Sequence, residues 1–119
     1  MGLERRAGDQ HTDDCAATAP RACQDMAAVR REIDRLDRRL VALMAERQAY
    51  IEAAARIKER ETDVRLEWRI EDVVAKVLAT AAENGLSKRI AEPVWRELIE
   101  RCIEHEYEIW RSLRHRNKK

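Results

Sequence analysis

The sequence predicts an all-α fold built from three helices, with one long N-terminal helix. The first observation is composition: of 119 residues, 45% are apolar and 39% are charged, with only three Gly, two Pro and no Phe. Such a mixture is typical of helical proteins with charged outer faces. The second observation is periodicity, because apolar residues recur every three or four positions over long stretches. That spacing places them on one face of a helix.

The first helix is predicted from Met26 to about Arg60, a stretch without Gly or Pro and rich in good helix formers. Its apolar seam consists of Met26, Val29, Ile33, Leu36, Leu40, Leu43, Tyr50, Ala54 and Ile57. At a rise of about 1.5 Å per residue, about 35 residues form a rod of roughly 50 Å. A compact domain of about 100 residues has a radius of gyration near 13 Å. One such domain is too small to cover this rod, so we expect a partner chain to cover it.

Charge and hydropathy argue against several classes of partner. The formal net charge of +1 argues against bulk electrostatic binding to DNA or to an anionic membrane. No apolar run approaches about 18 residues, so we expect no membrane-spanning helix. The N-terminus lacks the apolar core of a signal peptide, which favours a cytoplasmic location. The three cysteines are odd in number and show no CxxC spacing, which is typical of free thiols in a reducing compartment.

The flanking segments and the second helix are predicted from local signals. Residues 1–22 show no periodicity and are expected to form a disordered arm, and residues 114–119 a basic, frayed tail. The second helix is predicted over about Glu67–Glu83. Its buried side consists of Ile70, Val73, Val74, Val77, Leu78 and Ala81. Gly85 followed by the apolar Leu86 predicts the C-terminal stop of this helix.

The third helix is expected to follow Ser87, which can cap it. Pro93 lies too deep for the first turn, so either a short turn precedes the helix or the helix is kinked. The seam of this helix consists of Trp95, Ile99, Cys102, Ile109 and Leu113, with Leu98, Ile103 and Trp110 alongside.

Two charged residues interrupt these apolar seams, Arg47 in the first helix and Glu106 in the third. An ionised carboxylate in an apolar seam must be paired or protonated. One interpretation is a buried Arg47–Glu106 ion pair without a function. The other is a polar cavity for an anionic ligand, to which Lys58, Arg69 and Arg30 could add cations. One carboxylate among four cations suits a small dicarboxylate better than it suits a structural ion pair.

The combined spacing of five stretches resembles the all-helical chorismate mutases. These stretches are "VRREIDRLDRRLVALMAER" (Val29–Arg47), "RIK" (Arg56–Lys58), Arg69, "ENGL" (Glu83–Leu86) and "IEHE" (Ile103–Glu106). The resemblance covers residues 23–113 and implies one helical domain, an intertwined homodimer of three-helix subunits, and two active sites each shared between the chains. It also implies a small-molecule dicarboxylate substrate and chemistry that needs neither metal nor cofactor.

The resemblance assigns roles by position. Arg47, together with Arg30 of the partner subunit, would hold the substrate carboxylates. Lys58 would contact a carboxylate and the ether oxygen, and Glu106 would face the same oxygen, so these two are the expected catalytic residues. Arg69 matches a further arginine of the site. The implied reaction is the pericyclic Claisen rearrangement of chorismate to prephenate, in which the site selects a compact conformer and stabilises charge on the breaking ether bond.

Some positions depart from the pattern of many mutases. Leu66 and Ile70 stand where many members have an acidic residue for the ring hydroxyl of the substrate. Together with Cys23, "ENGL" and Trp110, they bring the chain closer to the isochorismate-pyruvate lyase branch of the family. Elimination of pyruvate from isochorismate, which yields salicylate, is therefore the alternative activity, and it would use the same cationic pocket.

Other classes of function explain less of the sequence. A non-catalytic helical dimerisation module explains the seams but not the joint occurrence of the charged residues described above. The basic tail could contact nucleic acid, but the core offers no basic face and no stacking aromatics. No metal site is predicted, because His11, His105 and His115 lack ligand spacing, and we expect His105 to face solvent.

Overall fold

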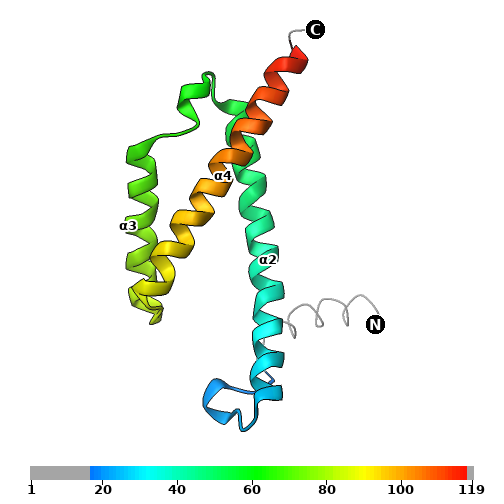
Figure 1. The fold of residues 1–119 in the computed structure, drawn as a ribbon, viewed down its shortest axis with the longest axis vertical. Helices are drawn as coiled ribbons and strands as arrows, with labels where there is room; N and C mark the ends of the chain where they lie inside the picture. Colours follow the sequence, from blue (N-terminus) through cyan, green and yellow to red (C-terminus); the bar gives the residue numbers. More distant parts are fainter. Residues whose placement is uncertain (1–16, 118–119) are drawn as a thin grey trace, which may run out of the picture. The chain divides into compact units, whose positions relative to one another are not determined.

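The computed structural model describes residues 17–117, and in this range the chain is helical without a strand (Figure 1). The elements are η1 (Pro20–Ala22), α2 (Met26–Ile57), η2 (Glu61–Asp63), α3 (Glu67–Asn84) and α4 (Lys88–Asn117). The all-α prediction with one long first helix is therefore confirmed. Most of the expected arm, residues 1–22, lies outside the described residues, as does the end of the expected tail. Within residues 17–117, no helix combines the length and the apolar character that crossing a membrane requires.

The chain divides between Arg47 and Gln48 into two compact parts, which we describe separately. In the first part, Asp25 caps α2, because its Oδ1 accepts a hydrogen bond of 2.8 Å from the amide of Ala28. The buried Glu32 accepts a hydrogen bond of 3.2 Å from the amide of Thr18, which ties the preceding segment to the helix. These local contacts explain why the helix begins at Met26, as the sequence predicts.

The apolar seam of α2 is largely open in a single chain. Ile33, Leu36, Leu40 and Leu43 are each between 45% and 53% exposed. Aliphatic side chains repeated along one helix face are normally buried, and burying each one is worth about 1.5–3 kcal/mol. This stripe is therefore an exposed apolar surface on the first part of the chain.

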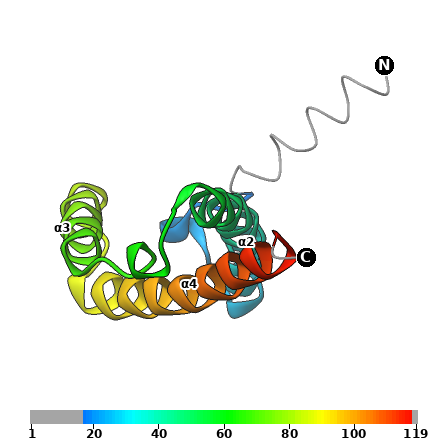
Figure 2. The same cartoon turned by 90° about the horizontal axis from the view of Figure 1, so that it is seen from above.

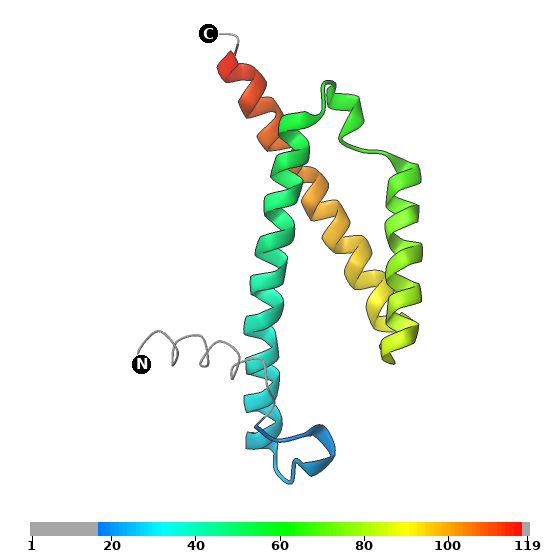
Figure 3. The ribbon, with the colours of Figure 1, turned by 180° about the vertical axis from the view of Figure 1, so that it is seen from behind.

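The second part, residues 48–117, is organised around the packing of α3 against α4. Its core consists of Val64, Ile70, Val74, Ile99 and Ile103, with Val73, Leu78, Tyr107 and Trp110 packed around it. Figure 2 shows α4 running from α3 towards the last turns of α2. The view from behind in Figure 3 agrees with this arrangement. Helix α4 is thus the element that connects α3 with the C-terminal end of α2.

The turn between α3 and α4 follows the predicted stop signal. Gly85 adopts the left-handed conformation, with φ at +73°. The amide of Leu86 donates to the carbonyl of Ala81 at 2.8 Å, and the amide of Gly85 donates to that of Ala82 at 3.3 Å. These two bonds form a Schellman motif, which satisfies the last carbonyls of α3. Glycine is favoured here because a side chain disfavours this backbone conformation.

The start of α4 resolves the two alternatives that Pro93 left open. The hydroxyl of Ser87 accepts a hydrogen bond of 3.2 Å from the amide of Arg89, so Ser87 caps the helix as predicted. No separate turn precedes the helix, and α4 runs through Pro93 without interruption. The missing amide of a proline removes one intrahelical hydrogen bond, which a helix of 30 residues tolerates near its first turns. The helix also extends to Asn117, so much of the expected basic tail is helical.

Candidate active site

The side chains of Lys58 and Glu106, the expected catalytic pair, meet in the second part of the chain. The ammonium nitrogen of Lys58 lies 2.7 Å from Oε2 of Glu106. The Glu106 side chain is only 4% exposed, whereas that of Lys58 is 26% exposed. A carboxylate buried to this degree needs a cation close to it. The fold therefore brings these two residues from distant positions in the sequence into direct contact.

The contact is an ion pair without the alignment of a hydrogen bond. Oε2 of Glu106 is buried, and among the described residues no donor meets it with hydrogen-bond geometry, although the Lys58 ammonium lies beside it. A buried oxygen in that state can still accept a hydrogen bond from a better aligned donor. The site thus offers a partly exposed ammonium beside a buried carboxyl group. If the carboxyl group is protonated, both groups can donate to one ligand oxygen.

Lys58 is positioned by the C-terminal half of α4. It directly follows the last residue of α2, and its amide still donates to the carbonyl of Ala54 at 2.9 Å. The indole Nε1 of Trp110 donates to the carbonyl of Lys58 at 3.0 Å. The guanidinium of Arg114 donates to the same carbonyl and, at 2.8 Å, to that of Ala55. Because the last carbonyls of a helix lack intrahelical partners, these donors satisfy groups that would otherwise need water.

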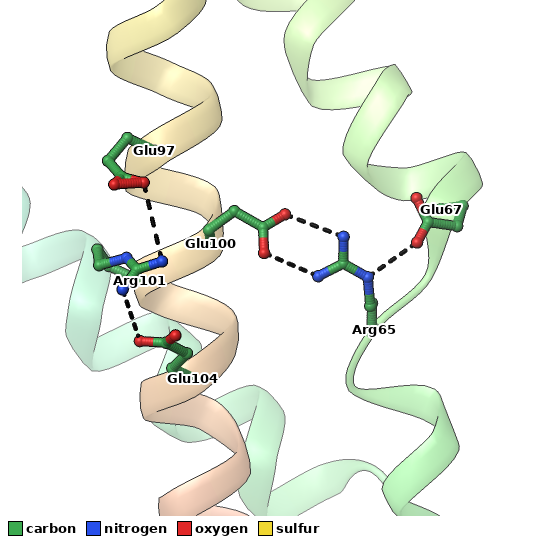
Figure 4. A network of polar contacts seen from close by, with 6 residues as sticks. All are labelled: Arg65, Glu67, Glu97, Glu100, Arg101 and Glu104. Carbon is green, nitrogen blue, oxygen red and sulfur yellow. Dashed lines mark hydrogen bonds and ion pairs between the residues drawn. The ribbon is translucent and has the colours of Figure 1, made fainter.

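The segment after Lys58 is also attached to α4 by arginine–carboxylate pairs. Arg65 forms two parallel hydrogen bonds with Glu100, at 2.9 and 3.0 Å, and a third of 2.8 Å with Glu67 (Figure 4). The hydrogen bonds from Arg65 hold the pKa of the Glu100 carboxyl below its usual value. Nε of Arg111 donates to Glu61 at 2.8 Å. Exposed pairs contribute little stability individually, but together they restrict how this connection can move.

A second side-chain contact joins α2 to α4 next to the site. Nε2 of His105 lies 2.6 Å from Oε2 of Glu52, and both side chains are partly buried. The hydrogen bond from His105, followed by one from Gln48, lowers the pKa of Glu52 from its usual value. The expectation that His105 faces solvent is therefore met only in part, because its side chain is 34% exposed and its ring also contacts Glu52. Periodicity alone could not show that a carboxylate on another helix lies opposite this histidine.

Of the three remaining candidate residues, Arg69 lies in the same part of the chain as the Lys58–Glu106 pair, and Arg30 and Arg47 lie in the first part. Arg69 is 54% exposed at the start of α3 and pairs with Asp72 of the same helix at 2.6 Å. Arg30 and Arg47 lie on α2 in the first part of the chain. Arg30 is exposed, whereas Arg47 is half-buried and engaged in a polar interaction.

Sequence reasoning missed the structural role of Trp110 and Arg114. Trp110 was expected as an apolar neighbour of the seam and as a feature of the lyase branch, and Arg114 as part of a basic, frayed tail. A signal for both was present, because Glu106, Trp110 and Arg114 are spaced four residues apart and so share one face of a helix. What the sequence lacks is the information that this face lies against the end of α2.

Comparison with known proteins finds a family model and a relative that are similar to this chain in sequence. Residues 29–107 match the family model described as chorismate mutase type II. The chain is also 30% identical over 95 residues to a protein of Pseudomonas aeruginosa named isochorismate pyruvate lyase. That alignment covers 80% of this chain and 94% of the relative. The matched residues include Lys58 and Glu106, and they end three residues before Trp110.

Proposed function

This chain belongs to the chorismate mutase type II family, and from that premise we propose that it is a chorismate mutase, which rearranges chorismate to prephenate. The observation that carries the proposal is the contact between Lys58 and the buried Glu106. Burying a carboxyl group beside an ammonium in a helical core costs desolvation free energy. A role of both groups in ligand binding would explain why the fold contains them.

The proposed role of the pair is to stabilise the ether oxygen of the substrate as its C–O bond breaks. Without a ligand, the two charges compensate each other across 2.7 Å. An anionic substrate attracts the Lys58 ammonium to itself, and the Glu106 side chain, which is 4% exposed, lies beside it and can donate to the same oxygen in its acid form. The ammonium and the carboxylic acid together donate to the ether oxygen. These donors lie in place before the reaction, so they act on the transition state without reorganisation.

The proposed role of the arginines is to hold the two carboxylates of the substrate. Arg47 is well suited because its guanidinium presents two parallel donors in a planar fork. Arg69 is exposed, and its present partner, Asp72, is shared with Lys76 at 3.0 Å, so the arginine can exchange that partner for an anionic ligand. Binding both carboxylates restricts the substrate to a compact conformer, which converts binding energy into rate.

We further propose that a second copy of the chain covers the apolar seam of α2. Arg30 of the partner subunit would then join Arg47 in binding the substrate carboxylates. The support is the exposure of Ile33, Leu36, Leu40 and Leu43 along one face of the helix. An interface of this kind is apolar enough for folding and association to be coupled. Sedimentation at micromolar concentration should show a dimer, and a folded, stable monomer would contradict this part of the proposal.

The second candidate function is isochorismate-pyruvate lyase. It is favoured by the similarity to the Pseudomonas aeruginosa protein of that name and by Leu66 and Ile70 in place of an acidic residue for the ring hydroxyl. Elimination also breaks the ether bond, so Lys58 and Glu106 could serve it in the same way. The two activities therefore differ in the substrate and in its product, rather than in the charged groups that they require.

Product identification distinguishes the two candidates. The purified protein is incubated separately with chorismate and with isochorismate, and the products are separated by chromatography. Prephenate from chorismate supports the mutase, and salicylate plus pyruvate from isochorismate supports the lyase. Lys58→Ala should abolish most of whichever activity is found, because it removes one of the two ether-oxygen donors. A folded protein that converts neither substrate above the uncatalysed rate refutes both.

A further inference from the structure

The C-terminal end of α2 is closed by side chains of α4 rather than by residues of its own. Arg114 reaches the carbonyls of Ala55 and Lys58, and Trp110 reaches the carbonyl of Lys58. Arg114 also stacks on the Trp110 ring, with its guanidinium carbon 4.5 Å from the ring centroid. The stack fixes the planar guanidinium in the orientation that its contacts with the backbone carbonyls require.

These contacts with α4 lie next to the expected catalytic lysine, because Lys58 directly follows the last residue of α2. Lys58 carries on its flexible side chain the ammonium that meets Glu106. Two donors on its carbonyl restrain this backbone. The same face of α4 carries Glu106 one turn before Trp110 and two turns before Arg114. One rigid helix thus fixes both members of the pair relative to each other.

We propose that Arg114 and Trp110 are positioning residues for Lys58: they hold its backbone so that the ammonium is aligned for the reacting oxygen. This inference rests on the proposed function, because it assumes that Lys58 acts on a substrate. Both residues bind backbone carbonyls of this segment, so their proposed effect is on alignment. Displacement of a catalytic group by about 1 Å can reduce the rate by roughly 10²-fold.

The alternative explanation is that these contacts only stabilise the helix end. A cation near the C-terminus of a helix is favourable in any case, because it interacts with the helix dipole. The two explanations differ in one respect. If Arg114 acts through Lys58, its loss should matter only while Lys58 is present, whereas a purely structural effect should add to the effect of removing Lys58.

The experiment is a double-mutant cycle of Arg114→Gln and Lys58→Gln in the full chain, assayed on the substrate that the wild type converts. Arg114→Gln should lower kcat by about 10- to 100-fold with KM changed less than about 3-fold. In the Lys58→Gln background, the same change should lower kcat less than about 2-fold. Trp110→Phe keeps the ring under the guanidinium but loses the N–H donor, so a smaller loss of kcat is expected.

Arg101→Gln is the matched control, because Arg101 lies on α4 and pairs with Glu97 and Glu104 of its own helix (Figure 4). It should leave kcat unchanged within about 2-fold. Additive losses in the cycle, or an Arg114→Gln enzyme with normal kcat, would overturn the proposal.

A second measurement does not depend on activity. Hydrogen exchange of the amides of residues 57–59 should accelerate about 10-fold or more in Arg114→Gln, but not in Arg101→Gln. Unchanged exchange would also overturn the proposal. If the wild type converts neither substrate while this acceleration is seen, the proposed function has failed, and the restraint on the Lys58 backbone stands without a catalytic consequence.

Discussion

Replacing Glu106 by Gln and by Ala tests whether its carboxyl group donates to the ether oxygen. The side chain is 4% exposed, so solvent cannot replace the donor that Glu106→Ala removes. Loss of one preorganised donor typically costs about 2.7–4 kcal/mol, or about 10²–10³ in kcat. The amide of the Gln variant can donate at any pH. Glu106→Gln should therefore keep kcat within about 10-fold of the wild type, whereas Glu106→Ala should lose two or three orders of magnitude.

Matched variants separate loss of the donor from loss of packing. The assay follows loss of substrate at one fixed pH. Glu104→Gln, an exposed change on the same helix, should keep kcat within about 2-fold of the wild type. Equal losses in Glu106→Gln and Glu106→Ala, or full activity in Glu106→Ala, would refute the assignment of Glu106 as a donor.

Three further substitutions test carboxylate binding by Arg47, the Glu52–His105 contact between α2 and α4, and the turn after α3. Arg47→Lys keeps the charge but loses the planar fork, so kcat/KM should fall about 10²-fold with the helical circular dichroism spectrum unchanged; full activity would exclude a bidentate role. The pKa of Glu52 is lowered by the hydrogen bond from His105, so this pair stabilises the fold above the usual pKa of glutamate and loses that contribution as pH falls through the lowered value. Urea unfolding from pH 3 to pH 7 should accordingly show a shallower acid decline of the unfolding free energy in Glu52→Gln than in the wild type; identical declines would contradict the linkage. Gly85→Ala should destabilise the protein by about 1–2 kcal/mol, because the added Cβ meets no neighbour but strains a backbone at φ +73°. Gly85→Asn should cost less in the same unfolding assay, and equal losses would contradict a purely backbone origin.

The sequence by itself determined the features that depend on near neighbours in the chain. The start of α2 and the bounds of α3 were predicted within a residue or so, because periodicity and good helix formers act locally. The stop at Gly85 and the cap at Ser87 were also predicted, since each depends on hydrogen bonds to backbone groups within a few residues. The interruptions of the seams at Arg47 and Glu106 pointed to a polar site, because a charge on an apolar face requires a partner.

Only the tertiary structure decided which partners those charges and helix ends have. Lys58 meets Glu106, and Trp110 meets the Lys58 carbonyl 52 residues away, because α4 lies against the last turns of α2. No local rule contains that packing: the spacing of Trp110 and Arg114 places them on one face of α4 but does not identify what that face contacts. The same holds for His105, whose carboxylate partner is on another helix. Local propensity sets where a helix begins and ends, whereas the pairing of side chains across helices depends on how the buried faces pack together.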